Sequence, residues 1–180
     1  MKMYLIRHSD AVEQDTPGYE DDSLRPLTEK GCNKTKKIAS ALKELGVKPD
    51  LIVSSPCVRA KQTAEILAKA LKYKQELAFS DMLAPMGNAD NIIGEINEKY
   101  HVDELILVGH EPCFSKLIGT LIAGNKVPPA PGVKKHQKPP NLAINLKKGG
   151  VCCLSTDDLR TERKAVLEWF LTPKILSELS

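Results

Sequence analysis

Met3-Tyr4-Leu5-Ile6-Arg7-His8 is a short apolar run that ends in a guanidinium and an imidazole. The run predicts a β-strand over Lys2–Ile6 whose C-terminal end carries two polar groups. Arg presents a planar fork of donors that matches phosphate oxygens, and a neutral imidazole is a nucleophile that can attack phosphorus near neutral pH. The end of this strand is therefore a candidate phosphoryl site.

The same pattern occurs twice more along the chain. Leu51–Val53 leads into Ser54-Ser55-Pro56 and Arg59, and Leu105–Val108 leads into Gly109, His110, Glu111 and Pro112. Parallel strands of an open α/β sheet bring their C-terminal ends to one edge, so we expect Arg7, His8, Arg59 and His110 to lie together. Two arginines and two histidines in one place suit a tetrahedral dianion.

The intervening segments predict helices, which makes the chain an alternation of strands and helices. Thr28 to Leu45 has a cap at Thr28 and ends at Gly46, and Ser55 and Pro56 are expected to open the next helix as cap and first-turn proline. Further helices are expected around Ile92–Tyr100 and Phe114–Ile122, the second of which should stop at Gly124. A strand is expected at Glu76–Phe79, and a hairpin at Leu142–Leu146 and Val151–Ser155. Trp169 and Phe170 are expected to close the C-terminal helix.

This order predicts one α/β domain over residues 1–180. We expect a three-layer sandwich with a mostly parallel central sheet, helices on both faces and a C-terminal antiparallel hairpin. The continuous apolar run Leu105–Val108 is typical of a central strand that is covered on both faces.

The quoted motifs, with Gln62-Thr63-Ala64 after Arg59, resemble the histidine phosphatase superfamily over most of the chain. Three softer stretches make it similar to the small bacterial phosphohistidine phosphatases of the SixA type: Arg25 to Thr28 with Gly31, Ala84 to Gly87, and Trp169 to Lys174. Ser9 departs from the pattern, since much of the superfamily has Gly after the histidine, but Ser also suits a tight turn.

The resemblance implies roles for these residues. His8 would attack phosphorus, carry it as a phosphohistidine and be freed by water, while Arg7, Arg59 and His110 would neutralise the phosphoryl oxygens. We expect the two arginines to be the main cause of a lowered pKa of His8. Arg25 and Ser9 would help to bind the phosphate or substrate. No metal and no cofactor is implied, and phosphate, vanadate or tungstate should compete with the substrate.

The turn after the third strand carries the main argument about substrate. Most branches of the superfamily have an acidic residue there, whereas this chain reads Leu83-Ala84-Pro85-Met86-Gly87, with Asp81 and Asp90 only flanking it. A phosphate monoester needs a proton on its alkoxide leaving group, but an imidazole can leave in a readily protonated form. The sequence thus favours phosphohistidine on a protein, such as a phosphotransfer domain of a histidine kinase relay.

Two alternatives stay open. The first is a phosphatase for small phosphate esters that uses Asp81, Asp90 or Glu111 as its general acid. The second is a non-catalytic phosphate-binding module, against which the intact set Arg7, His8, Arg59 and His110 speaks. The segment Lys126–Asn141, with five prolines and four lysines, is either a solvated loop or a docking surface for the substrate protein.

Composition limits the other classes. Only 4% of the residues are aromatic and the net charge is +3, which argues against a nucleic acid or membrane binder. No apolar stretch is long enough to span a bilayer, and Met1 leads directly into the first strand. Five cysteines without paired metal-ligand spacing indicate reduced thiols. We therefore expect a cytoplasmic monomer.

Overall fold

A six-stranded sheet with the order β3-β2-β4-β1-β5-β6 forms the centre of the computed structural model, which describes residues 1–124, 144–157, 159 and 164–179. Strands β1 to β4 run parallel, and β5 is antiparallel to both β1 and β6. The strands are β1 Lys2–Arg7, β2 Leu51–Ser54, β3 Ala78–Phe79, β4 Glu104–Gly109, β5 Val151–Ser155 and β6 Val166–Leu171. The mostly parallel sheet predicted from the sequence is confirmed.

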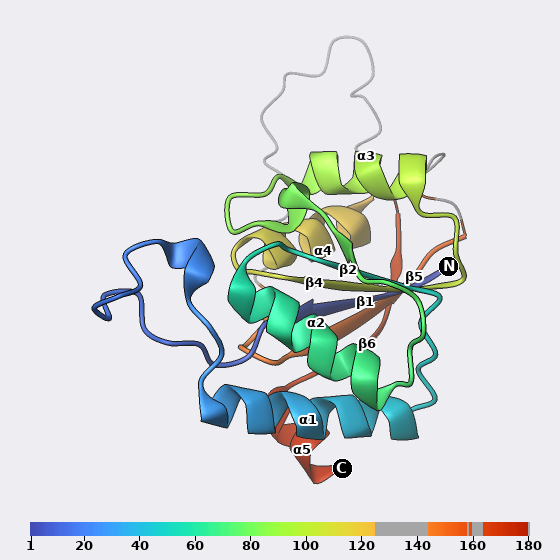
Figure 1. The fold of residues 1–180 in the computed structure, drawn as a ribbon. Coiled ribbons are helices and arrows are strands. Elements are labelled where there is room, and N and C mark those ends of the chain that lie inside the picture. Colours follow the sequence, from blue (N-terminus) through green and yellow to red (C-terminus); the bar gives the residue numbers. More distant parts are fainter. Residues whose placement is uncertain (125–143, 158, 160–163, 180) are drawn as a thin grey trace, which may run out of the picture.

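Helices cover both faces of this sheet (Figure 1). Helices α1, α2 and α5 lie on one face, and α3 and α4 lie on the other. Their bounds are α1 Glu29–Glu44, α2 Val58–Ala70, α3 Ala89–Lys99, α4 Cys113–Ala123 and α5 Pro173–Glu178, with short 3-10 helices η1 at Asp22–Leu24 and η2 at Asp81–Leu83. The three-layer α/β sandwich is therefore also confirmed. The segment Lys126–Asn141 lies outside the described residues.

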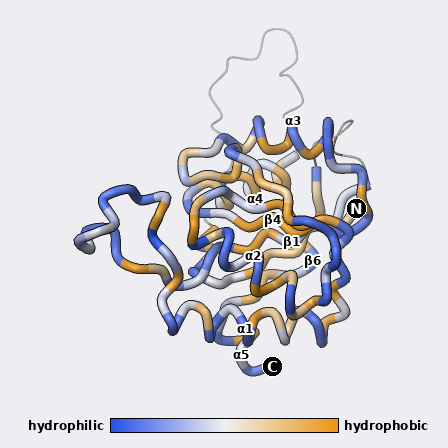
Figure 2. The backbone as a smooth tube through the Cα atoms, in the orientation of Figure 1, coloured by the Kyte–Doolittle hydropathy of each residue, from blue (hydrophilic) through white to orange (hydrophobic). Residues whose placement is uncertain are grey.

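The apolar run at the start of the chain is explained by burial on both sides of the sheet. Met3 and Leu5 pack into the core under α3 and α4, whereas Tyr4 and Ile6 pack into the core over α1 and α2. Because successive strand residues point to opposite faces, a strand covered on both sides must be apolar at every position. Figure 2 shows the resulting concentration of hydrophobic residues in the strands.

The expected ends of two helices are correct. The Thr28 hydroxyl accepts a hydrogen bond from the Gly31 amide at 3.0 Å and caps α1. Gly46 and Gly124 follow α1 and α4 with φ values of +77° and +70°, which glycine adopts without the steric cost borne by other residues. These caps fix the length of the helices that flank the site.

The predicted start of α2 is wrong. Ser55 does not cap the helix and Pro56 is not its first residue, because α2 begins at Val58 with Cys57 in the cap position. The Ser55 amide donates to the carbonyl of Val108 at 2.9 Å, so the chain still runs beside β4 at that point. Arg59 nevertheless lies in the first turn of α2, as expected.

The structure has the predicted C-terminal antiparallel strand pair, but β5 and β6 form it and residues 144–146 do not pair with β5. Residues 144–147 form no strand, residues 142 and 143 lie outside the described part of the chain, and β5 pairs with β1 and β6. Gly149, with φ +81°, donates its amide to the carbonyl oxygens of Arg7 and His8, so the turn before β5 lies against the end of β1. Trp169 and Phe170 belong to β6 and do not close the C-terminal helix.

Candidate active site

A pocket of about 240 Å³ lies where β1 and β4 end and α2 begins. It brings together Arg7, His8, Arg25, Arg59 and His110, which are far apart in the sequence except for the first two. The remaining lining residues are Ala11, Gln14, Asp22, Pro85, Glu111 and Lys148. Nearly all of the residues predicted for the site therefore line one cavity.

Ser9 is the predicted site residue that the structure places elsewhere. Its side chain is fully buried and accepts a hydrogen bond from the hydroxyl of Thr35 on α1 at 2.7 Å. Its backbone carbonyl, however, lies 2.8 Å from Nδ1 of His8. Ser9 contributes to the site through its main chain, and its hydroxyl does not line the pocket.

The ring of His8 is oriented by that carbonyl. A carbonyl oxygen only accepts hydrogen bonds, so the proton of the neutral imidazole lies on Nδ1 and the lone pair lies on Nε2. Nε2 accepts a hydrogen bond from Nε of Arg59 at 3.3 Å. Burial lowers the pKa of His8 to about 3, and the charges of Arg59, Arg7 and Lys148 act in the same direction while the Ser9 bond opposes them. His8 is thus a neutral base at pH 7.

Arg59 is buried in the first turn of α2, and each of its side-chain nitrogens has a partner. Nε donates to His8, Nη1 donates to the backbone carbonyl of Asp22 at 2.6 Å, and Nη2 donates to Oδ2 of Asp22 at 2.7 Å. A guanidinium with three fixed donors is held in one orientation. Asp22 therefore sets the position of the positive charge next to His8.

Asp22 is a functional candidate that the sequence motifs do not reveal. It begins η1, lines the pocket, and forms ion pairs with Arg25 and Arg59. Burial alone would raise the pKa of Asp22, but hydrogen bonds from these two guanidiniums outweigh burial and hold the pKa below its usual value. The available signal in the sequence is an acidic residue three positions before Arg25.

Arg7 has unused donor capacity at the pocket. Its Nη1 donates to the carbonyl of Leu146 at 2.9 Å, and its Nε is buried without a hydrogen-bond partner among the described residues. Burial lowers the pKa of Arg7, although Glu111 and Asp10 oppose that shift. A guanidinium with an unpaired donor at a cavity suits an anionic ligand.

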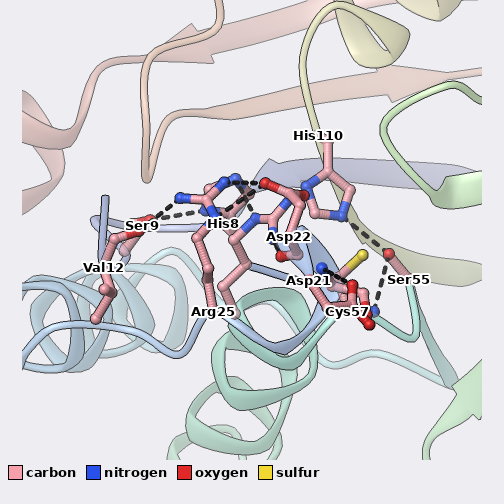
Figure 3. Close-up of polar contacts among 11 residues, drawn as sticks. His8, Ser9, Val12, Asp21, Asp22, Arg25, Ser55, Cys57 and His110 are labelled. Carbon is pink, nitrogen blue, oxygen red and sulfur yellow. Dashed lines mark hydrogen bonds and ion pairs between the residues drawn. The ribbon is translucent and has the colours of Figure 1, made fainter. Parts of the chain in front are cut away.

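His110 follows β4 and lies beside His8, with the two ring centroids 4.9 Å apart. Its Nε2 lies 2.9 Å from the hydroxyl of Ser55, whereas its Nδ1 is buried without a partner among the described residues (Figure 3). Burial lowers the pKa of His110 to about 3, with His8 and Arg59 acting in the same direction. Both histidines are therefore neutral at physiological pH.

The rim of the pocket carries two further cations and one further carboxylate. Arg25 donates to Asp22 and to the carbonyl of Val12, so its charge is largely directed at Asp22. Lys148 and Glu111 also line the cavity, whereas Asp81 and Asp90 do not. Among the three candidate general acids named from the sequence, Asp81, Asp90 and Glu111, only Glu111 lines the pocket.

A cationic pocket with two neutral imidazoles, at the carboxyl edge of a parallel sheet, defines a class of protein that binds and transfers phosphoryl groups. The family model of the histidine phosphatase superfamily (branch 1) matches residues 3–101. An uncharacterized protein of Picosynechococcus sp. (strain PCC 7002) is 34% identical over 98% of this chain and 99% of its own length. The chain belongs to the histidine phosphatase superfamily and is a phosphatase.

Two further relatives refine the comparison. The phosphohistidine phosphatase SixA of Escherichia coli (strain K12) is 27% identical over 71% of this chain and 78% of its own length. The solved structure of the protein histidine phosphatase SixA complexed with tungstate superposes with a TM-score of 0.77 at 24% identity, covering 98% of this chain and 99% of that one. This chain therefore shares the SixA fold.

Metal-binding clusters and membrane spans are both absent from the described residues. Within them, no group of three or more His, Cys, Asp or Glu side chains is arranged to hold a metal ion. The helices in the same part of the chain are too short or too polar to cross a membrane.

Proposed function

We propose that this protein removes the phosphoryl group from phosphohistidine on a partner protein, with His8 as the nucleophile. The observation that carries the proposal is the Nε2 lone pair of His8, which belongs to a neutral ring at the pocket and lies beside Arg59. The relationship to SixA, a phosphohistidine phosphatase, supports the same substrate class.

The proposed reaction has two displacements on phosphorus. In the first, the Nε2 lone pair of His8 forms a bond to phosphorus while the P–N bond breaks in a phosphohistidine that is protonated on its other ring nitrogen. The electron pair stays on the substrate ring, which leaves as neutral imidazole. In the second, a water oxygen attacks phosphorus, the electron pair of the P–N bond returns to Nε2, and inorganic phosphate leaves while water gives up one proton to the solvent. Arg7, Arg59 and His110 stabilise the phosphoryl oxygens in both steps.

Asp22, Asp81 and Asp90 are poorly suited to protonate a leaving group, which favours a substrate whose leaving group needs little protonation. Asp22 is held as an anion by Arg25 and Arg59, so it is a poor proton donor at neutral pH. Asp81 and Asp90 do not line the pocket. An imidazole leaves more readily than an alkoxide under these conditions because it titrates near neutral pH.

A direct comparison of substrates tests the proposal. We expect rapid loss of phosphate from a histidine-phosphorylated phosphotransfer domain, slow cleavage of aryl phosphates, and hardly any cleavage of alkyl phosphates. His8→Ala should abolish turnover while its circular dichroism spectrum stays that of the wild type. Near wild-type turnover by His8→Ala, or a preference for alkyl phosphates, would show the proposal to be wrong.

One observation favours a second candidate function, a phosphatase for small phosphate esters. Oε1 of Glu111 is buried at the pocket without a hydrogen-bond partner among the described residues, which leaves it free to contact the leaving-group oxygen of a bound ester. Glu111→Gln with Asp81→Asn as the matched control separates the two functions. A loss of about a hundredfold in Glu111→Gln alone supports the ester phosphatase, because a general acid contributes roughly 10²–10⁴ in rate.

A further inference from the structure

Ser55 is a buried hydroxyl that the reaction proposed above does not use. The residue is fully buried, and its backbone amide is fixed to the carbonyl of Val108 on β4. Its Oγ lies 2.9 Å from Nε2 of His110 and accepts a hydrogen bond from the Cys57 amide at 3.3 Å. Figure 3 shows the Ser55 hydroxyl joined to both partners.

The hydrogen count at this contact distinguishes two arrangements. A hydroxyl has one hydrogen to donate, and a neutral imidazole has one N–H and one acceptor nitrogen. If Ser55 donates to Nε2, its hydrogen is satisfied and the His110 proton lies on Nδ1. If Nε2 instead carries the proton and donates to Ser55, the buried hydroxyl hydrogen has no acceptor among the described residues.

The first arrangement has the lower cost. It leaves one donor unpaired among the described residues, Nδ1–H of His110, and that residue lines the pocket. The second leaves both the Ser55 hydrogen and the Nδ1 lone pair without partners there, and each buried unsatisfied polar group is penalised. An anion in the pocket widens the difference, because a lone pair on Nδ1 would repel an oxygen that Nδ1–H would bind.

We propose that Ser55 is a positioning residue that fixes the proton of His110 on Nδ1, so that a neutral imidazole donates a hydrogen bond to the phosphoryl oxygen. The inference rests on the proposed function for the identity of the anion. The hydroxyl acts through the histidine and does not touch the substrate. This role fits the position of Ser55 in the segment beside β4, where it does not cap α2.

Neutrality of His110 makes the choice of tautomer decisive. Burial, His8 and Arg59 keep the pKa of the imidazole low and the ring uncharged over the physiological range, so only one of its nitrogens can donate. A charged imidazolium would carry a hydrogen on each nitrogen and would need no selection. The pocket already has cationic donors in Arg7 and Arg59, and His110 adds a directed neutral one.

Histidine ¹⁵N–¹H NMR of the unliganded wild-type protein tests the tautomer without any substrate. We expect the His110 signals of the Nδ1–H form in the wild type and a shift toward the Nε2–H form in Ser55→Ala. Ser54→Ala is the matched control, because Ser54 is equally buried and its hydroxyl donates to the backbone carbonyl of Ser55 and not to His110. An Nε2–H form in the wild type, or an unchanged tautomer in Ser55→Ala, would overturn the inference.

Tungstate affinity provides the second readout. Ser55→Ala should weaken tungstate binding by about tenfold, as expected when a hydrogen bond to a charged group is lost in part. The amide of His110→Asn supplies an N–H donor near the position of Nδ1 that does not depend on Ser55. The same Ser55→Ala change should therefore cost less than about twofold in the His110→Asn background, as in a double-mutant cycle of coupled residues.

An undiminished tenfold loss in the His110→Asn background would also overturn the inference, because Ser55 would then act through packing. The NMR measurement uses the unliganded folded protein and the affinity measurement uses tungstate, so both are independent of which phosphoryl compound the enzyme hydrolyses. A protein that fails to hydrolyse phosphohistidine but shows the expected tautomer and coupling would refute the proposed function and support the role of Ser55.

Discussion

At the scale of single residues, the site works by removing two imidazoles from water. A histidine nucleophile must be neutral, and an exposed histidine with a pKa of about 6.5 is largely protonated below that pH. Burial is the largest cause of the low pKa of His8, and the neighbouring cations add to it. The sequence analysis predicts that the two arginines are the main cause of the lowered pKa of His8. The pKa is lowered as predicted, but desolvation by burial contributes more than the arginines do.

The low pKa of His8 predicts the pH profile of the reaction. His8 must lose its proton to attack, and its pKa in the free enzyme lies at about 3. We therefore expect kcat/KM to show no loss from His8 protonation at mildly acidic pH, and to fall only as the pH approaches this pKa. Initial rates with a phosphohistidine protein, corrected for spontaneous hydrolysis, measure the acid limb. A midpoint at or above the ordinary histidine value would contradict a buried neutral nucleophile.

A second prediction concerns the charge beside His8. Arg59→Lys keeps one positive charge but cannot reproduce the three contacts that join His8 to the carbonyl and the carboxylate of Asp22. We expect kcat to fall by about a hundredfold, comparable with the loss of one electrostatic donor to a transition state. The exposed Lys61 of the same helix is the control, and Lys61→Arg should leave kcat nearly unchanged. Equal rates for Arg59→Lys and the wild type would remove Arg59 from the proposed mechanism.

Site residues that follow a strand or open a helix were predictable from the pattern of strands and helices, whereas Arg25, in an irregular segment, was expected only from the family resemblance, and Asp22 was not predicted. Arg7, His8 and His110 follow directly from strand ends, so the sheet topology brings them together. Asp22 lies in a long connection before α1, where no periodicity indicates which side chain points inward. The sequence predicts that Ser55 caps α2, whereas its hydroxyl contacts His110. Capping preferences are local, so they contain no information about an imidazole that is distant in the sequence.

At the scale of the elements, α1 can lie close to residues 8–10, which follow β1 at the site, because the first turn of α1 contains a glycine. Gly31 lies in that turn, and a Cβ added to it would overlap the carbonyl oxygen of Asp10. Asp10 is two residues beyond His8, so this close approach sets the path of the chain that leaves β1. Gly94, inside α3, has open space where a Cβ would lie.

The same substitution should therefore have opposite effects in the two helices. Gly31→Ala must push α1 away from a backbone atom, and we expect it to lower the free energy of unfolding by about 2 kcal/mol or more, as overpacking does. Gly94→Ala should raise that free energy by about 0.5–1 kcal/mol, because alanine is the better helix former. Urea unfolding followed by circular dichroism measures both. A stabilising Gly31→Ala would show that the contact with Asp10 does not constrain the loop.

Elements with strong local signals were predictable, and their pairing was less so. The caps of α1 and α4 and the four parallel strands follow from apolar runs and glycines. The partner of β5 does not, because the Lys147-Lys148-Gly149-Gly150 turn has the composition of a hairpin but packs against the end of β1. A turn sequence specifies local geometry, whereas the choice between two neighbouring strands depends on burial in the whole sheet.

At the scale of the whole molecule, the candidate active site lies at one edge of a sheet whose strands are otherwise buried in the core. Strands β1 and β4 are apolar along most of their length and carry Arg7, His8 and His110 at or just beyond their ends, where α2 contributes Arg59. Two imidazoles are thereby buried against the core in their neutral form. The free energy of that burial links the activity of the site to the stability of the fold.

The last prediction follows from this linkage. His8 and His110 bind protons near pH 6.5 in the unfolded chain, but the pKa of each is lowered to about 3 in the folded protein. Between these values the unfolded state binds more protons, so the free energy of unfolding falls as the pH is lowered. The contribution is fully present above the unfolded pKa, and each histidine can add a slope of up to about 1.4 kcal/mol per pH unit below it.

Carboxylates also destabilise the fold in acid, so the test compares variants. We expect the double substitution His8→Asn and His110→Asn to lose less stability than the wild type between about pH 7 and about pH 4.5, measured by urea unfolding at each pH. His101→Asn, at an exposed position, should follow the wild type. If all three proteins lose stability equally, the two imidazoles are not buried in their neutral form, and the neutral nucleophile on which the proposed reaction depends is lost with them.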